Sequence, residues 1–141
     1  MAHKTIDEIQ IGDTAFQTME ITQEHVETFG HITNDLNPMH FDQDYASKTM
    51  FKQKIAHGMY IGSLFSRIFG MDLPGEGTIY VSQSLRFRRP VYFGDVIKAE
   101  VNVKAIDSER NRVFFDCIAT NQHGDKVIVG EAELMPPIQG N

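Results

Sequence analysis

Several features that mark particular classes of protein are scarce in this chain. Its 141 residues include a single cysteine, Cys117, so no disulfide can form within the chain, which suits a reducing compartment. No apolar run approaches the ~20 residues that a membrane-spanning helix needs. The first residues also lack the apolar stretch of a signal peptide. We therefore predict a cytoplasmic protein without a membrane partner.

Positive charge is also in short supply. The 13 Lys and Arg residues are outnumbered by 19 Asp and Glu, which gives a net charge of -6. This balance argues against a nucleic-acid partner. The composition is otherwise ordinary, with 41% apolar and 23% charged residues. The length predicts one domain over residues 1–141, large enough to bury a core without a disulfide or a metal.

The spacing of apolar residues predicts an α+β fold. A strand over 14–21 is followed by a helix that begins at Thr22, and by a short helix over 42–48. The helix over 56–70 contains only one charged residue and should be buried. Its apolar face consists of Ile61, Leu64, Phe65 and Ile68, and Gly70 is its expected C-cap.

Beyond this helix the apolar pattern alternates with a period of two. It predicts four antiparallel strands, over 78–88, 96–106, 112–121 and 126–135, joined by short turns. One strand, several helices and then four strands indicate a curved antiparallel sheet wrapped around one central buried helix.

The most informative stretch is Asp35-Leu36-Asn37-Pro38-Met39-His40. Pro38 fixes its own φ and moves Asn37 away from helical angles, so the stretch cannot be one continuous helix. A rigid turn can hold a carboxylate and an imidazole at a set distance, as acid–base chemistry on water requires. The same six residues fit an Asx-type turn beside a surface histidine equally well.

Several motifs together resemble the MaoC-like hot-dog family, and within it most closely the (R)-specific enoyl-CoA hydratases. The resemblance runs from about residue 11 to residue 135. It rests on the Asp35 to His40 stretch, on His57-Gly58-Met59, on the buried helix after it, and on Gly94-Asp95 before a strand. These proteins reversibly hydrate a trans-2-enoyl-CoA to the (R)-3-hydroxyacyl-CoA. The resemblance implies a hot-dog fold and a homodimer whose sheets join edge to edge, or a hexamer built from such dimers.

By position in these motifs, the resemblance implies roles for individual residues. Asp35 and His40 become the catalytic pair, and the backbone N–H of Gly58 becomes the donor that holds the thioester oxygen. Asn37 and Ser66 match the substrate-binding region. The family often has glycine immediately before the catalytic aspartate. This chain has Asn34 there, and asparagine tolerates a left-handed φ better than most residues.

Hydration adds a hydroxyl at C3 of the enoyl thioester and a proton at C2. One group must take a proton from water, and a donor must polarise the thioester carbonyl. We assign Asp35 as the principal base and His40 as its partner and proton donor. The reverse division stays open, because a coupled pair need not have separable roles. Free N–H groups at the start of the buried helix suit an enolate oxygen at Gly58, unless that glycine only permits a tight turn.

Ser66 lies eight residues beyond Gly58, or roughly 12 Å along a helix. The two residues should therefore not contact the same substrate atom. Ser66 is expected to bond the Asp35 and His40 side or to line the acyl end of the pocket. The alternative is a helix serine that bonds back to its own chain.

Two further sets of side chains bear on the substrate. Arg86 and Arg88 should share one strand face, and they are candidates for contact with the CoA phosphates or else a solvated strand edge. The large side chains of Phe65, Phe69 and Met71 predict short acyl groups of about four to six carbons, because bulk shortens a pocket.

No cofactor is expected beyond the CoA that forms part of the substrate. Asp35, His40 and Asp42 lack a third strong ligand, so we predict no metal, and His57 is expected to be structural. Three rival functions stay open: an acyl-CoA thioesterase, a 3-hydroxyacyl dehydratase acting on acyl carrier protein, and a non-catalytic acyl-thioester binder. The pathway served also stays open, whether polyester monomer supply, fatty-acid oxidation or a short-chain acyl route.

Overall fold

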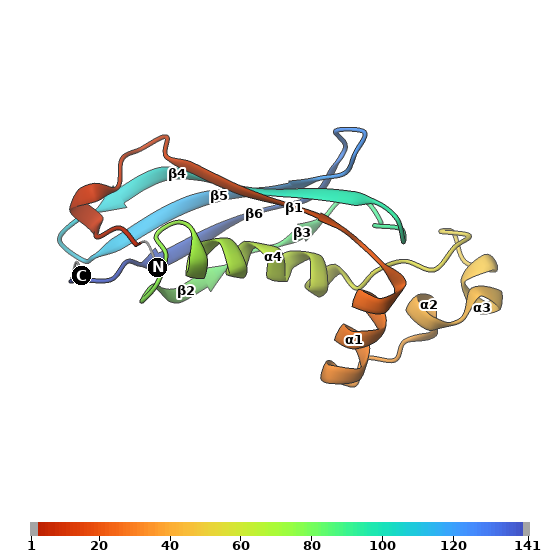
Figure 1. Cartoon of the computed structure of the whole chain (residues 1–141). Helices are drawn as coiled ribbons and strands as arrows, with labels where there is room; N and C mark the ends of the chain where they lie inside the picture. Colours follow the sequence, from red (N-terminus) through yellow and green to blue (C-terminus); the bar gives the residue numbers. More distant parts are fainter. Residues whose placement is uncertain (1–2, 140–141) are drawn as a thin grey trace.

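A six-stranded antiparallel sheet is the main element of the fold. The computed structural model describes residues 3–139. The strands are β1 (Thr14–Glu20), β2 (Ile79–Gln83), β3 (Arg86–Phe87), β4 (Val96–Asp107), β5 (Arg112–Thr120) and β6 (Lys126–Met135). Their order is β1-β4-β5-β6-β2, and β3 also pairs with β6 (Figure 1). The α+β hot-dog plan is confirmed.

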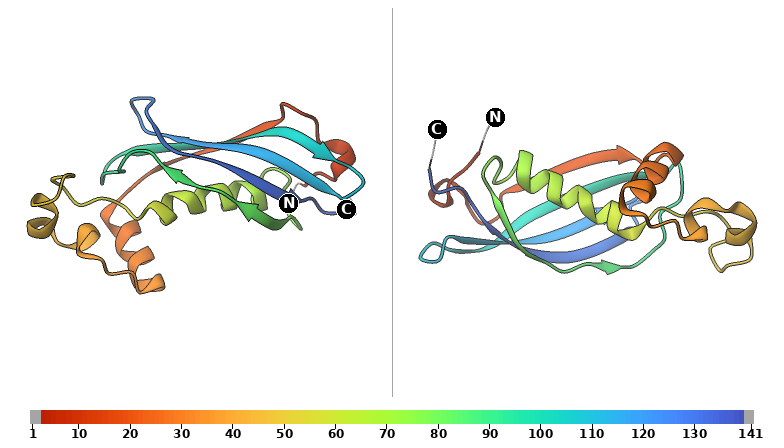
Figure 2. Two further views of the ribbon diagram at one scale, coloured as in Figure 1. Left: turned by 180° about the vertical axis from the view of Figure 1, so that it is seen from behind. Right: turned by 90° about the horizontal axis from the view of Figure 1, so that it is seen from below.

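Helix α4 (Gly58–Met71) lies along one face of the curved sheet, and the core lies between them (Figure 2). The predicted apolar face is confirmed, because Ile61, Phe65 and Ile68 are fully buried and Leu64 nearly so. Opposite them lie inward-facing side chains of the central strands: Val101, Phe115, Cys117 and Leu134. The expected C-cap at Gly70 was wrong, since the helix continues to Met71 and Asp72 caps it.

The single strand predicted over 78–88 is broken into β2 and β3. The break falls at Ser84, whose N–H donates to the Glu131 carbonyl at 2.8 Å, while its hydroxyl accepts from the Glu131 N–H at 3.0 Å. The Ser84 carbonyl lies where a side chain at Gly130 of β6 would have to go. This close approach, possible only at a glycine, ends the regular pairing.

Three short helices lie beyond the end of the sheet where α4 begins: α1 (Gln23–Thr33), α2 (Pro38–Phe41) and α3 (Gln43–Ser47) (Figures 1 and 2). Thr22 caps α1 as predicted, accepting from the His25 N–H at 3.1 Å. Val26 is fully buried, but Ile32 is 80% exposed. The spacing of Val26, Phe29 and Ile32 predicts one apolar stripe on this helix, and Ile32 does not follow that prediction.

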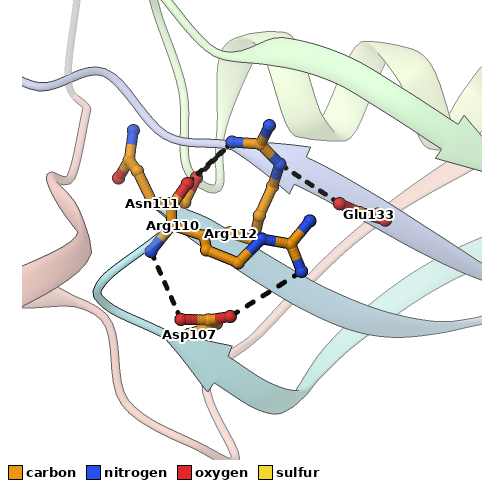
Figure 3. Close-up of polar contacts among 5 residues, drawn as sticks. All are labelled: Asp107, Arg110, Asn111, Arg112 and Glu133. Carbon is orange, nitrogen blue, oxygen red and sulfur yellow. Dashed lines mark hydrogen bonds and ion pairs between the residues drawn. The ribbon is translucent and has the colours of Figure 1, made fainter.

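At the opposite end, polar contacts hold the turn between β4 and β5 (Figure 3). Asp107 accepts from the Arg110 N–H at 3.3 Å, and Arg112 donates to Glu133 of β6 at 3.1 Å. Asn111 supplies the left-handed residue of the turn, with φ 56°. These contacts fix the register of the hairpin far from α1 to α3. Within residues 3–139, no helix combines the length and apolar character needed to cross a membrane.

Candidate active site

The turn that carries Asp35 begins at Asn34. This residue ends α1 in a left-handed conformation, with φ 62° and ψ 24°. Asparagine adopts these angles more readily than most residues, so it can occupy the position where the family often has glycine. The Asp35 N–H then bonds the Thr33 hydroxyl at 3.3 Å, which fixes the exit of the turn.

His40 follows Asp35 by five positions and lies in the single turn of helix α2. Pro38 occupies the first position of α2, where a missing N–H costs nothing. Asn37 caps the helix, and its side-chain oxygen accepts from the Met39 N–H at 3.1 Å. The oxygen of Asn37 is thereby used within the chain, and the role of this residue in binding a substrate stays a prediction.

Gly30 allows this turn to pack against α1. A methyl group at Gly30 would overlap the Phe41 ring of α2 and lie 3.1 Å from the Asp35 carbonyl oxygen. The absence of a side chain on α1 therefore helps to position both Asp35 and the helix that carries His40.

We expect Gly30→Ala to lower the free energy of unfolding by about 1–3 kcal/mol, because it overpacks this contact. The matched control is Gly70→Ala, another helical glycine, whose added methyl meets nothing within 4 Å. That control should be neutral or stabilising by up to about 1 kcal/mol. Urea unfolding measures both changes. Equal stability of the two variants would contradict the packing role of Gly30.

One ring nitrogen of His40 is committed to the backbone. Its Nδ1 lies 2.6 Å from the Ile55 carbonyl oxygen, which can only accept, so Nδ1 carries the proton in the neutral ring. The lone pair is then on Nε2. Burial lowers the pKa of His40 below its ordinary value of 6.5, His57 lowers it further, and the Ile55 carbonyl and Asp35 oppose the shift. His40 is thus a neutral base with one free nitrogen.

His57 joins this pair, which the sequence analysis did not foresee. One ligand-type atom each from Asp35, His40 and His57 lies within 4.8 Å of the others. The premise that no third strong ligand accompanies Asp35 and His40 was therefore wrong. Zinc ligands lie about 2.0–2.1 Å from the metal, so the ligand atoms of a tetrahedral site lie closer to one another than 4.8 Å. The grouping of these three residues therefore does not by itself define a zinc site, and the absence of a metal stays a prediction.

A cavity of about 400 Å³ opens beside His40. It is lined by His40 and Gly58, by Phe87 of β3, and by Arg88 and Arg89 just after it. Gly58 is the first residue of α4, so its N–H has no partner within the helix. A Cβ at Gly58 would lie 2.6 Å from the Phe87 ring. Glycine here permits close approach of that ring, with the free N–H beside it.

Ser66 lies in a second cavity of about 370 Å³, between α4 and β2. Met59 lines both cavities, while His40 and Gly58 line only the first. The structure gives Ser66 no contact with Asp35 or His40, and its place at the acyl end of the pocket stays a prediction. Tyr80 and Leu85 form other parts of the wall around it.

The two arginine candidates are separated. Arg88 lines the His40 cavity together with Arg89, whereas Arg86 lines a different cavity with Asp116 and Glu131. The prediction that Arg86 and Arg88 share one face assumed a continuous strand, but β3 ends at Phe87. Arg89 was missed for the same reason.

The large residues thought to shorten the acyl pocket have different positions. Phe65 and Phe69 are buried in the core, and Met71 is exposed near the end of α4. None of them lines the cavity that holds Ser66. Phe69 nevertheless packs edge-on against Tyr80, with ring centroids 5.5 Å apart, so it supports one wall of that cavity from behind.

The fold and the site together define a hot-dog domain with an Asp/His pair at the start of its central helix. The chain belongs to the family described as MaoC like domain, whose model matches residues 9–123. An (R)-specific enoyl-CoA hydratase of Rhodospirillum rubrum is 40% identical over 134 residues, covering 95% of this chain and 92% of that protein. The unliganded R-hydratase PhaJ1 of Pseudomonas aeruginosa superposes with a TM-score of 0.90 at 41% identity, covering 96% of this chain and 86% of that chain. A mitochondrial 3-hydroxyacyl-[acyl-carrier-protein] dehydratase of Arabidopsis thaliana is 36% identical over 140 residues, covering 97% of this chain and 82% of that protein.

Proposed function

We propose that this protein is an (R)-specific enoyl-CoA hydratase, a hydro-lyase that adds water to trans-2-enoyl-CoA and removes it in reverse. The observation that carries the proposal is the position of the Asp35/His40 pair. His40 lines a cavity of about 400 Å³ together with Gly58, whose N–H has no partner within α4, and Asp35 lies within 4.8 Å of His40. The hydratases named among the relatives support the (R) product.

The hydrogen bond between Nδ1 of His40 and the Ile55 carbonyl helps to decide which residue of the pair acts as the base. With Nδ1–H held by Ile55, Nε2 is free to take a proton from water. Asp35 accepts a hydrogen bond from the same water, while the oxygen of that water attacks C3. The proton taken up by His40 then passes to C2, and the Gly58 N–H stabilises the enolate oxygen that forms between the two events. This favours the reverse of the first assignment, with His40 as the base.

This mechanism predicts the pH dependence of the reaction. Hydration requires His40 without a proton on Nε2, so kcat/KM should be constant at high pH and fall as pH drops through the pKa of His40. Burial holds that pKa below 6.5, so the acid limb of the kcat/KM profile should lie below pH 6.5. Activity that instead falls as pH rises through this range would mean that His40 must start protonated.

The proposed activity can be tested by mixing purified protein with crotonyl-CoA and following loss of the enoyl-thioester absorbance, with chiral analysis of the product. We expect (R)-3-hydroxybutyryl-CoA, at the same rate with and without a chelator. Inert enoyl-CoAs together with release of free CoA thiol from acyl-CoA would instead identify a thioesterase. A strong preference for enoyl-carrier-protein would favour the second candidate, a carrier-protein dehydratase. The Arabidopsis relative, which is named as such a dehydratase, is the observation behind this candidate.

Short acyl groups remain the proposed substrates. The wall of the Ser66 cavity is backed by Phe69 through Tyr80, and a backed wall limits how far an acyl chain can extend. Crotonyl-CoA should therefore be hydrated faster than dodecenoyl-CoA. The reverse preference would overturn this part of the proposal.

The proposed contacts with the CoA phosphates now rest on Arg88, with Arg89 beside it at the His40 cavity. Arg86 is the weaker candidate for this role, because it lines a different cavity.

The proposed dimer joins two chains at β2, an edge strand of the sheet. Ile79 of this strand is 57% exposed and Val81 is 42% exposed. An exposed apolar edge strand favours pairing with a second chain. Light scattering should give twice the chain mass, and a monomer at working concentration would refute the dimer.

A further inference from the structure

His57 is the most completely buried polar side chain in the described part of the chain, at 2% exposure. It lies immediately before α4, but its side chain makes no capping bond to that helix. Its ring packs instead against Phe29 of α1, with centroids 4.9 Å apart, and against His40 of α2 at 3.9 Å with 31° between the planes. His57 therefore connects α1, α2 and the start of α4.

The hydrogen bond of His57 determines its protonation. Its Nε2 lies 3.0 Å from the backbone carbonyl oxygen of Asp35. Because a carbonyl only accepts, Nε2 carries the proton and Nδ1 is bare in the neutral ring. That Nδ1 is buried and has no hydrogen-bond partner in residues 3–139. A buried acceptor without a partner costs stability, and a phenylalanine would provide the same packing without this cost. Packing alone does not account for a histidine here.

We infer that His57 is a positioning residue for the Asp35/His40 pair. Its Nε2–H fixes the main chain at Asp35, and its ring fixes the plane of the His40 ring. This inference rests on the proposed function, because it states how that pair is kept ready. It also gives His57 an influence on His40, because the His57 imidazole, with ring centroids 3.9 Å apart, lowers the pKa of the His40 ring.

Other charged groups also act on His40. Asp35 lies within 4.8 Å on the loop before α2, and Arg88 and Arg89 line the same cavity from beyond β3. Phe29 and Phe41 are the uncharged rings that face His57 from α1 and α2. Asp35 raises the pKa of His40, whereas His57 lowers it. Removing the His57 imidazole should therefore make His40 easier to protonate.

Two variants separate the parts of this role. His57→Gln keeps an N–H donor near the position of Nε2 and removes the ring, whereas His57→Phe keeps a ring and removes the donor. We expect His57→Phe to lower kcat for crotonyl-CoA roughly 10- to 100-fold with KM little changed, because misplaced groups lose rate rather than affinity. His57→Gln should recover most of this loss. In both variants the acid limb of the pH profile should move to higher pH.

A second measurement does not depend on activity. The pKa of His40, followed by NMR of its ring protons in wild type and in His57→Gln, should rise in the variant. If wild type does not hydrate any enoyl-CoA, the proposed function fails, and this titration still reports whether His57 acts on His40. If His57→Phe does not fold, the rate and titration of His57→Gln decide. Wild-type kcat in His57→Phe, or an unchanged His40 pKa in His57→Gln, would overturn the inference.

Discussion

Replacing His40 by asparagine is expected to lower kcat for crotonyl-CoA at least about 100-fold, the loss expected when a general base is removed. Asparagine places an amide N–H near the position of Nδ1, so the bond to Ile55 can be kept while Nε2 is deleted. The substitution removes Nε2, the nitrogen proposed to take the proton from water, together with the ring that packs against His57.

Asp35→Asn should have a loss of the same size, because the amide keeps the shape of the side chain but accepts only through one oxygen. His123→Asn is the matched control: His123 is an exposed histidine in the turn between β5 and β6, outside α1 to α3. It should retain full activity. Thermal unfolding of all three variants separates loss of chemistry from loss of fold. A fall in kcat of less than tenfold for both Asp35→Asn and His40→Asn would rule out their assignment as the catalytic pair.

Gly58→Pro is expected to lower kcat/KM by about 10²–10³, the size of effect seen when one oxyanion donor is removed. Gly58 is the first residue of α4, where proline fits the helix and only the N–H is lost. His57 before it has φ -62° and ψ 130°, which are angles compatible with a following proline. The substitution therefore deletes the proposed donor with little other change to the backbone.

Gly58→Ala is the control for this experiment. Both variants place a Cβ 2.6 Å from the half-exposed Phe87 ring, which must move aside. Only the proline variant also lacks the N–H. The difference in kcat/KM between the two variants therefore measures the donor, and any loss that they share measures the crowding. Equal activity of the two variants would refute the oxyanion role of Gly58.

Local signals in the sequence were enough to predict the elements that frame the site. The short helix α2 was not predicted, but Thr22 caps α1, Asn34 adopts the left-handed turn, and Pro38 keeps the Asp35 to His40 stretch from forming one continuous helix. Each of these depends on the conformational preference of one residue and its immediate neighbours. The apolar face of α4 follows in the same way, since a helix with one charged residue has to be buried.

The features that were missed depend on contacts between segments far apart in the chain. The break between β2 and β3 requires Gly130 to lie under Ser84. The residues near position 84 in the sequence give no local signal for this break. That break in turn separates Arg86 from Arg88. His57 was interpreted as structural, although it belongs to the His57-Gly58-Met59 motif and lies next to Gly58. Its contact with Asp35 becomes visible only when the loop and α4 meet.

The Asp35/His40 pair is proposed to direct water to C3 of an enoyl thioester. The most direct test is to incubate the protein with crotonyl-CoA in oxygen-18 water and to locate the label by mass spectrometry. We predict label in the 3-hydroxyl group of (R)-3-hydroxybutyryl-CoA, with the thioester intact. Label in a free carboxylate, accompanied by released CoA, would contradict the account, because the water would then have attacked the carbonyl carbon.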